Sequence, residues 1–196
     1  MAVPQHDLQP GDAVLVLDTQ VDFCPGGALP VAEGDQVVPV LNRWLAAARE
    51  RGVPVYAARD WHPPQHQSFR ERGGEWPPHC LQESPGAAYH PDLELPPDTV
   101  PVIKGVRLDQ DQYSAFDQTG LGARLRQDGV RRLWVGGLTQ DVCVRASVLD
   151  ALRLGFTVML LADATRPVDP ENGRRAIEEM REAGAIVTQT ESAASA

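Results

Sequence analysis

Six short apolar segments recur along the chain, and this feature constrains its fold more than any other. They span residues 13–18, 53–60, 100–104, 131–137, 156–163 and 185–190. Their residues are apolar in succession, whereas a strand with one face in water would alternate between apolar and polar positions. The segments are therefore predicted to be strands of a parallel sheet that helices cover on both faces.

Helical patterns separate these segments. In residues 37–51 apolar side chains recur every three to four positions, and Gly52 follows as a stop signal. The same form recurs, with a glycine directly after it, at residues 121–128, 141–154 and 170–183. The alternation predicts an α/β fold of three layers, α/β/α, around a six-stranded, mainly parallel sheet of strand order 3-2-1-4-5-6. We expect residues 1–196 to form a single domain.

Composition argues against several classes of protein. The chain has 18 Lys and Arg against 27 Asp and Glu, a net charge of −9 that repels nucleic acid and anionic membranes. It has no apolar run of the ~18 residues that a membrane span needs. Its three cysteines, an odd number without a CxxC pair, argue against a secreted disulfide framework. We expect a cytoplasmic protein with no nucleic-acid or membrane partner; the oligomeric state stays open, a homo-oligomer included.

Four reactive side chains follow the ends of predicted strands. Asp18, Asp60 and Lys104 end the first three strands, and Cys143 comes shortly after the fourth. Ligands of open α/β sheets bind beyond the carboxyl ends of the strands. We therefore expect these side chains to meet at one edge of the sheet, as the parts of a catalytic site must.

Cys143 is the candidate nucleophile. Asp141 is expected to cap a helix whose positive end would favour the thiolate of Cys143. Asp18 could shuttle the proton, and Lys104 could hold negative charge. Each residue also has a plainer interpretation: a buried small hydrophobe, a turn residue and a solvated strand end, respectively. Their combination favours the catalytic interpretation.

A candidate metal site lies in the loop of residues 61–99 and the aspartate before it. Asp60, His62 and His79 offer oxygen and nitrogen ligands for one divalent metal ion and leave positions open for water or substrate. His66 is either a fourth ligand or a group that supports one. Zn, Fe(II) and Mn(II) suit this set alike. The alternative is a polar loop with scattered histidines.

Two aromatic side chains adjoin these clusters. Phe23 and Trp76 are candidates to hold a flat ring between them. Aromatic residues are more often part of the core, which remains the alternative for both.

Five motifs, in order, resemble those of a known family. DTQVDF (18–23), DWHP (60–63), WPPHC (76–80), IKG (103–105) and GLTQDVCV (137–144) are similar to segments of the nicotinamidases, which are isochorismatase-like cysteine hydrolases. The similarity spans roughly residues 13–190. It implies a metal-containing enzyme that converts nicotinamide to nicotinic acid and ammonia in NAD salvage, with pyrazinamide as a further substrate.

The resemblance also implies catalytic roles. Cys143 would attack the carboxamide after Asp18 takes its proton, while Lys104 supports the charged state. The backbone N–H groups of Thr139 and Cys143 would form the oxyanion hole, and the Leu138–Thr139 peptide would be cis. Ammonia would then leave, and water would cleave a thioester on Cys143.

The same resemblance implies how the substrate is held. Asp60, His62 and His79 would bind the metal, and the pyridine nitrogen would bind that metal or its waters. Phe23 and Trp76 would stack on the ring. Leu138 is also placed among the substrate-binding residues.

Two positions depart from the family pattern. Gln140 and Val142 leave the nucleophile in place but make the shape of the pocket, and hence the substrate, uncertain. A related cysteine hydrolase acting on another small amide or ureide is therefore a second interpretation. A metal-binding domain without catalysis is a third.

Overall fold

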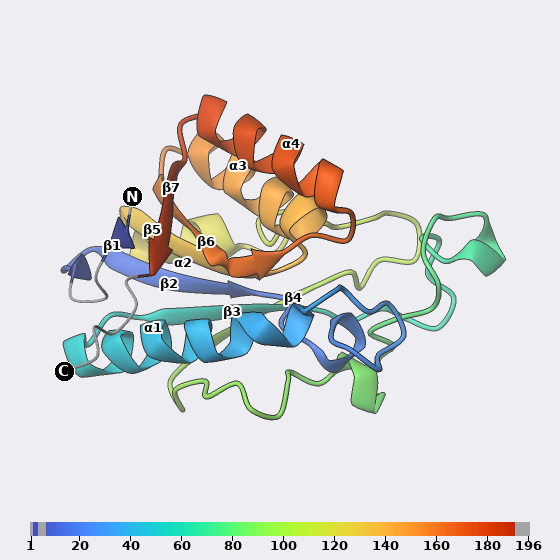
Figure 1. The fold of residues 1–196 in the computed structure, drawn as a ribbon. Helices are drawn as coiled ribbons and strands as arrows, with labels where there is room; N and C mark the ends of the chain where they lie inside the picture. The colour runs from blue at the N-terminus through green and yellow to red at the C-terminus, as the bar shows by residue number, and fades with distance from the viewer. Residues whose placement is uncertain (1, 4–6, 191–196) are drawn as a thin grey trace.

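The computed structural model describes residues 2–3 and 7–190 and consists of a parallel sheet with helices on both faces (Figure 1). The strands are β1 (Ala2–Val3), β2 (Asp12–Leu17), β3 (Val55–Asp60), β4 (Val100–Lys104), β5 (Arg132–Leu138), β6 (Thr157–Arg166) and β7 (Ile186–Thr190). Their order is β1-β7-β6-β5-β2-β3-β4, and every neighbouring pair is parallel. Without β1, this is the predicted order 3-2-1-4-5-6, so the predicted fold class is confirmed.

The seventh strand, β1, was not predicted. It is two residues long and pairs with the end of β7. A segment this short carries no periodicity from which a strand could be predicted.

Helices cover the two faces of the sheet unequally (Figure 1). The helix α1 (Val37–Arg51) lies on one face; α2 (Leu121–Gln127), α3 (Arg145–Arg153) and α4 (Pro170–Glu182) lie on the other. On the α1 face, Trp44 stacks on Trp134 of β5 with ring centroids 4.7 Å apart. On the other face, Leu125, Val148 and Met180 are fully buried against the sheet. The predicted helix over residues 37–51 agrees with α1 at both ends.

The predicted helix over residues 141–154 differs from the structure. Residues Gln140–Val144 form a single π-helical turn, and α3 begins only at Arg145. The carboxylate of Asp141 caps neither element, because it accepts hydrogen bonds from the backbone N–H groups of Val168 and Asp169, at 2.9 and 3.1 Å. The predicted cap at Asp141 is therefore wrong, and this side chain instead holds the connection between β6 and α4.

Two long connections leave the sheet at the carboxyl ends of the strands (Figure 1). The helical turns of residues 61–99 are short 3₁₀ turns at Arg70–Arg72 and Pro85–Ala87, and isolated bridges join His62 to Leu81 and Phe69 to Trp76. The backbone of His62 fixes this loop, since its N–H donates to the carbonyl of Cys80 and its carbonyl accepts from Gln82. The second connection, residues 105–118, packs beside the first. Both lie at the edge of the sheet at which reactive side chains were expected (Figure 1).

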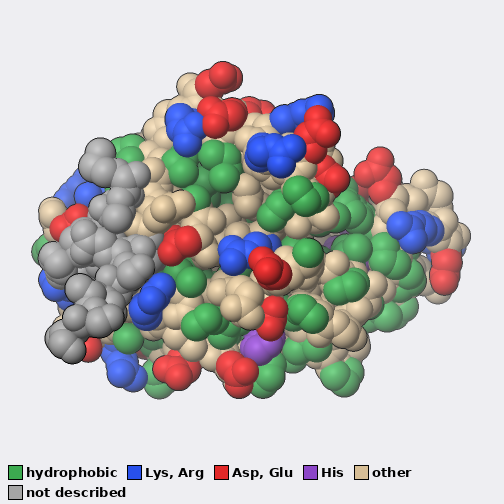
Figure 2. Space-filling model, in the orientation of Figure 1, with side chains coloured by type: hydrophobic (Ala, Val, Ile, Leu, Met, Phe, Trp, Pro, Cys, Tyr) green, Lys and Arg blue, Asp and Glu red, His purple; other side chains and the backbone are tan. Residues whose placement is uncertain are grey.

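The surface mixes charges of both signs. Figure 2 shows acidic and basic side chains interspersed over the face in view, where the basic ones among the described residues do not gather into a stripe. In the part of the chain that the structure describes, no helix has the length and apolar character to cross a membrane.

Candidate active site

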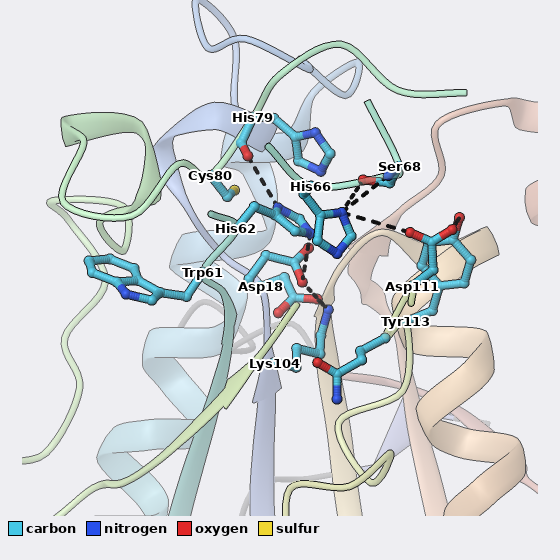
Figure 3. Close-up of polar contacts among 12 residues, drawn as sticks. Asp18, Trp61, His62, His66, Ser68, His79, Cys80, Lys104, Asp111 and Tyr113 are labelled. Carbon is cyan, nitrogen blue, oxygen red and sulfur yellow. Dashed lines mark hydrogen bonds and ion pairs between the residues drawn. The ribbon is translucent and has the colours of Figure 1, made fainter. Parts of the chain in front are cut away.

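The carboxyl ends of β2, β3 and β4 bring three charged side chains together. The ammonium nitrogen Nζ of Lys104 lies 2.8 Å from Oδ2 of Asp18, 2.6 Å from Oδ1 of Asp60 and 3.3 Å from Sγ of Cys143. Asp60 and Lys104 are opposite each other in the β3–β4 register. Figure 3 shows the Lys104 side chain reaching toward Asp18. The predicted meeting of these four residues is confirmed.

Burial sets unusual protonation equilibria in this cluster. Burial alone would lower the pKa of Lys104, but the carboxylates of Asp18 and Asp60 outweigh it and hold that pKa well above its usual range. Burial would likewise raise the pKa of Asp60, but Lys104 and the neighbouring histidines lower it instead. For Asp18, burial prevails and raises the pKa to about 7. Lys104 therefore stays charged, Asp60 stays ionised, and Asp18 exchanges a proton near neutral pH.

The carboxylate of Asp18 is open toward the thiol. Its Oδ2 pairs with the Lys104 ammonium, and apart from this ion pair neither oxygen has a polar partner among the hydrogen bonds of the described residues. A carboxylate oxygen of Asp18 and Sγ of Cys143 lie within 4.8 Å of each other. Asp18 can therefore accept the proton of the Cys143 thiol.

The Cys143 thiol itself is protonated at rest. Burial raises its pKa well above the ordinary value; Lys104 opposes this, while Asp18 and Asp60 add to it. The expected contribution of the helix end in favour of the thiolate is therefore outweighed by burial and two carboxylates. The proton must leave as the nucleophile reacts.

Asp60, His62 and His79 form a donor set that fits a divalent metal. One ligand atom from each lies within 4.8 Å of the other two. Nδ1 of His62 donates to the carbonyl of His79 at 3.2 Å, and Nδ1 of His79 donates to the carbonyl of Pro77 at 2.8 Å. Because a carbonyl only accepts, Nε2 of each ring keeps its lone pair. Burial lowers the pKa of His62 to about 4 and also lowers that of His79, so both rings stay neutral, as ligands must be.

Glycine at position 105 leaves room beside these donors. A Cβ on Gly105 would lie 2.7 Å from Nε2 of His62 and 3.2 Å from Oδ1 of Asp60, and the φ of this glycine is +69°. A side chain there would fill the space in front of the donor atoms. The space and the donor chemistry therefore both fit a first-row divalent ion.

A second group with similar spacing does not fit a metal. Ligand atoms of Asp18, Asp60 and Cys143 also lie within 4.8 Å of one another. The ammonium group of Lys104 contacts all three residues, however. It supplies the positive charge that a cation would bring.

His66 is not placed as a fourth ligand. Its Nδ1 accepts from the backbone N–H of Ser68 at 3.2 Å and lies 2.7 Å from the Ser68 hydroxyl. Its Nε2 donates to the carbonyl of Gln110 at 3.2 Å. Both nitrogens are thus engaged, and the fully buried ring packs against His62 with centroids 4.6 Å apart (Figure 3). Of the two predicted roles for His66, the structure favours support of a ligand.

A cavity opens over the thiol and the donor set. It is partly open to solvent, and its empty space, open solvent included, is about 400 Å³. Its lining includes Phe23, Asp60, His62, Trp76, His79, Thr139, Val142 and Cys143. The predicted aromatic, oxyanion-hole, metal-site and nucleophile residues therefore face one space, and Asp18 and Lys104 lie buried close to the thiol.

Leu138 does not line this cavity. Its side chain is fully buried in the core cluster on the α1 face. The peptide that joins it to Thr139 is cis, as the resemblance implied. The placement of Leu138 among the substrate-binding residues is therefore corrected: its side chain packs in the core.

Only one of the two departures from the family pattern faces the cavity. The Gln140 amide donates to the carbonyl of Gly173 in α4 at 2.9 Å and accepts from the Thr165 hydroxyl at 3.3 Å. Val142 lines the cavity. Of the two, Val142 is thus the one placed to shape the cavity, whereas Gln140 holds α4.

The cavity also has lining residues that sequence reasoning missed. They are Leu29, Ser68, Asp111, Gln112, Tyr113 and Val168. The hydroxyl of Tyr113 accepts from Nε1 of Trp76 at 3.1 Å and donates to a carboxylate oxygen of Asp111 at 3.5 Å. For Asp111, Gln112 and Tyr113, the available signal was the break in the strand–helix alternation at residues 105–118, which does not single out any residue within that loop.

Comparison with known proteins decides the family. A model of the isochorismatase domain matches residues 12–192. The chain belongs to the isochorismatase family.

Individual members of the isochorismatase family match most of the chain. A nicotinamidase of Escherichia coli (strain K12) is 40% identical over 201 residues, covering 91% of this chain and 94% of the relative. A crystal structure of the pyrazinamidase of Pyrococcus horikoshii in complex with zinc has a TM-score of 0.89 at 47% identity and covers 92% of this chain and 99% of that one. A structure of PnC1 from L. infantum in complex with nicotinate has a TM-score of 0.86 at 36% identity, with 96% of each chain covered.

Proposed function

We propose that this chain is a metal-containing nicotinamidase, which hydrolyses nicotinamide to nicotinic acid and ammonia and also accepts pyrazinamide. One observation carries the proposal: the Cys143 thiol lines the same cavity as the Asp60, His62 and His79 donors, and behind it the Lys104 ammonium contacts both the thiol and the Asp18 carboxylate. Relatives that match nearly the whole chain are named for these two activities.

Acylation begins at the thiol. As Sγ of Cys143 attacks the carbonyl carbon of the amide, its proton passes to Asp18, whose pKa of about 7 suits a group that takes and returns protons near neutrality. Negative charge on the former carbonyl oxygen would be stabilised by the backbone N–H groups of Thr139 and Cys143. Lys104 balances the charge of the thiolate as it forms, since its Nζ lies 3.3 Å from Sγ.

Loss of ammonia completes acylation, and water then removes the acyl group. Asp18 returns the proton to the leaving nitrogen, the C–N bond breaks, and ammonia departs from a thioester on Cys143. Asp18 then takes a proton from the attacking water, whose oxygen forms the new C–O bond as the C–S bond breaks. Nicotinic acid leaves, and the thiol regains its proton, so the sum is amide plus water giving acid plus ammonia.

The remaining cavity residues would hold the ring. Phe23 and Trp76 line the cavity, and Phe23 lies 5.4 Å from the His79 ring, centroid to centroid. Asp60, His62 and His79 would hold a divalent metal, which when bound supplies a Lewis-acidic position for the pyridine nitrogen or a bridging water. The choice among Zn, Fe and Mn stays open, because this donor set suits all three.

The cellular setting is part of the same proposal. We assign the reaction to NAD salvage in the cytoplasm, within one hydrolase domain of residues 1–196. None of the cysteines Cys24, Cys80 and Cys143 forms a disulfide. A mechanism that needs a free thiol suits a reducing compartment.

An ammonia-coupled assay over a panel of amides, together with elemental analysis of the purified protein, tests the proposal. Turnover of nicotinamide and pyrazinamide with about one metal ion per chain is expected. Turnover of other amides or ureides alone would favour a sister amidase, the alternative that Val142 in the cavity motivates. The absence of any turnover after metal is restored would favour a metal-binding domain without catalysis.

A further inference from the structure

The strand β3 continues further than its pairing with β2. The register between them ends at Leu17 and Ala58, followed by a hydrogen bond from the N–H of Asp18 to the carbonyl of Ala58 at 3.0 Å. The chain then leaves the sheet at Asp18, whose φ is +41°. Residues two apart on a strand present their backbone groups to the same side. The N–H and C=O of Asp60 therefore point to a place where β2 no longer continues.

The side chain of Gln20 occupies that place. Its Oε1 accepts from the N–H of Asp60 at 2.8 Å, and its Nε2 donates to the carbonyl of Asp60, also at 2.8 Å. The primary amide thus substitutes for a peptide group of the missing strand. On the opposite side of β3, the N–H of Trp61 donates to the carbonyl of Lys104 at 2.9 Å. The backbone around Asp60 is held from both sides.

Gln20 has no freedom to move within this arrangement. Its second amide hydrogen is donated to the carbonyl of Ala87 at 2.9 Å, and the residue is fully buried. Its own backbone N–H donates to the carbonyl of Asp18 at 2.8 Å. One amide therefore ties together the turn after Asp18, the end of β3 and the 85–87 turn.

We propose that Gln20 is a positioning residue for metal binding, because it fixes the backbone from which the Asp60 carboxylate projects. This inference rests on the metal site of the proposed function but assigns a role to a residue outside it. It links two parts of the site, since the residue two places after the general base Asp18 holds a metal donor in place. Loss of a group that orients a metal ligand typically lowers affinity by about 10- to 100-fold.

The test compares Gln20→Met with Asn42→Leu. Methionine has nearly the length of glutamine but makes none of the three hydrogen bonds. Asn42 of α1 makes a similar pair of bonds and does not line the cavity: its amide donates to the carbonyl of Asp92 at 2.8 Å and accepts from the N–H of Glu94 at 2.9 Å. Each variant removes one side-chain amide that holds backbone. Asn42 holds the 61–99 loop, whereas Gln20 holds the end of β3, where the metal donor Asp60 lies.

Zinc affinity is measured on metal-free protein by competition with a chromogenic chelator, with thermal unfolding of the same samples. Gln20→Met is expected to bind Zn²⁺ about 10- to 100-fold more weakly than wild type, and Asn42→Leu to bind it as wild type does. Wild-type affinity in Gln20→Met, or an equal loss in both variants, would overturn the proposal.

A second variant serves if Gln20→Met does not fold. Gln20→Asn, whose shorter side chain cannot reach Asp60 and Ala87 together, is then judged by the same criteria. Because zinc binding is read without substrate, Gln20-dependent binding in a chain that releases no ammonia would uphold this inference while refuting the proposed reaction. Nicotinamide turnover by a chain that binds no zinc or other divalent ion would refute this inference while upholding the proposed reaction.

Discussion

Asp18→Asn is predicted to remove most of the activity and yet to stabilise the metal-free chain at alkaline pH. Burial raises the pKa of Asp18 from its ordinary 3.8 to about 7. Between these values the folded chain keeps a proton that the unfolded chain releases, so the folded state loses stability as the pH rises through this window. The difference between the two pKa values corresponds to about 4 kcal/mol. The whole penalty is present above the folded pKa of about 7.

Asparagine stays neutral at every pH and removes this penalty. Urea unfolding with a chelator present should show the variant more stable than wild type by about 2 kcal/mol at about pH 5.5 and by about 4 kcal/mol at about pH 8.5. The same variant should turn over nicotinamide about 100- to 10,000-fold more slowly, because the general base is lost. If the variant is instead less stable than wild type at about pH 8.5, the ion pair with Lys104 outweighs burial and the reasoning is refuted.

Three other substitutions probe the nucleophile and the metal donors. Cys143→Ala should abolish ammonia release while circular dichroism shows a retained fold; activity in this variant would exclude the covalent mechanism. His79→Ala should lower the metal content per chain in elemental analysis and raise the KM for nicotinamide, and unchanged metal content would remove His79 from the ligand set. Gly105→Ala should also lower metal content, because its Cβ would lie 2.7 Å from Nε2 of His62 at a φ of +69°; full occupancy in this variant would show that the space beside His62 is not needed.

The catalytic cluster was predictable because each charged residue directly follows an apolar strand. Asp18 and Lys104 each had a plainer interpretation as a turn or strand-end residue, but parallel strands bring their carboxyl ends to one edge, which favoured a shared site. The ends of α1 were equally predictable, because its apolar periodicity stops at Gly52 and this residue adopts the left-handed conformation that glycine favours.

Other features depend on tertiary contacts that no local pattern reports. Asp141 looked like a helix cap, but it binds the backbone of residues 168 and 169, which lie far along the chain. The protonated resting state of Cys143 follows from complete burial beside two carboxylates, which outweighs the helix end. Tyr113 and Gln20 belong to the same class, since their roles depend on loops that meet only in the folded chain.

Trapping the covalent intermediate tests the account most directly. Metal-loaded enzyme is mixed with excess nicotinamide, quenched in acid within one turnover and digested for mass spectrometry. The peptide that contains Cys143 is predicted to carry one nicotinoyl group in place of the thiol hydrogen. Rapid consumption of nicotinamide with no adduct at any time point, or with an adduct on a different residue, would contradict the mechanism.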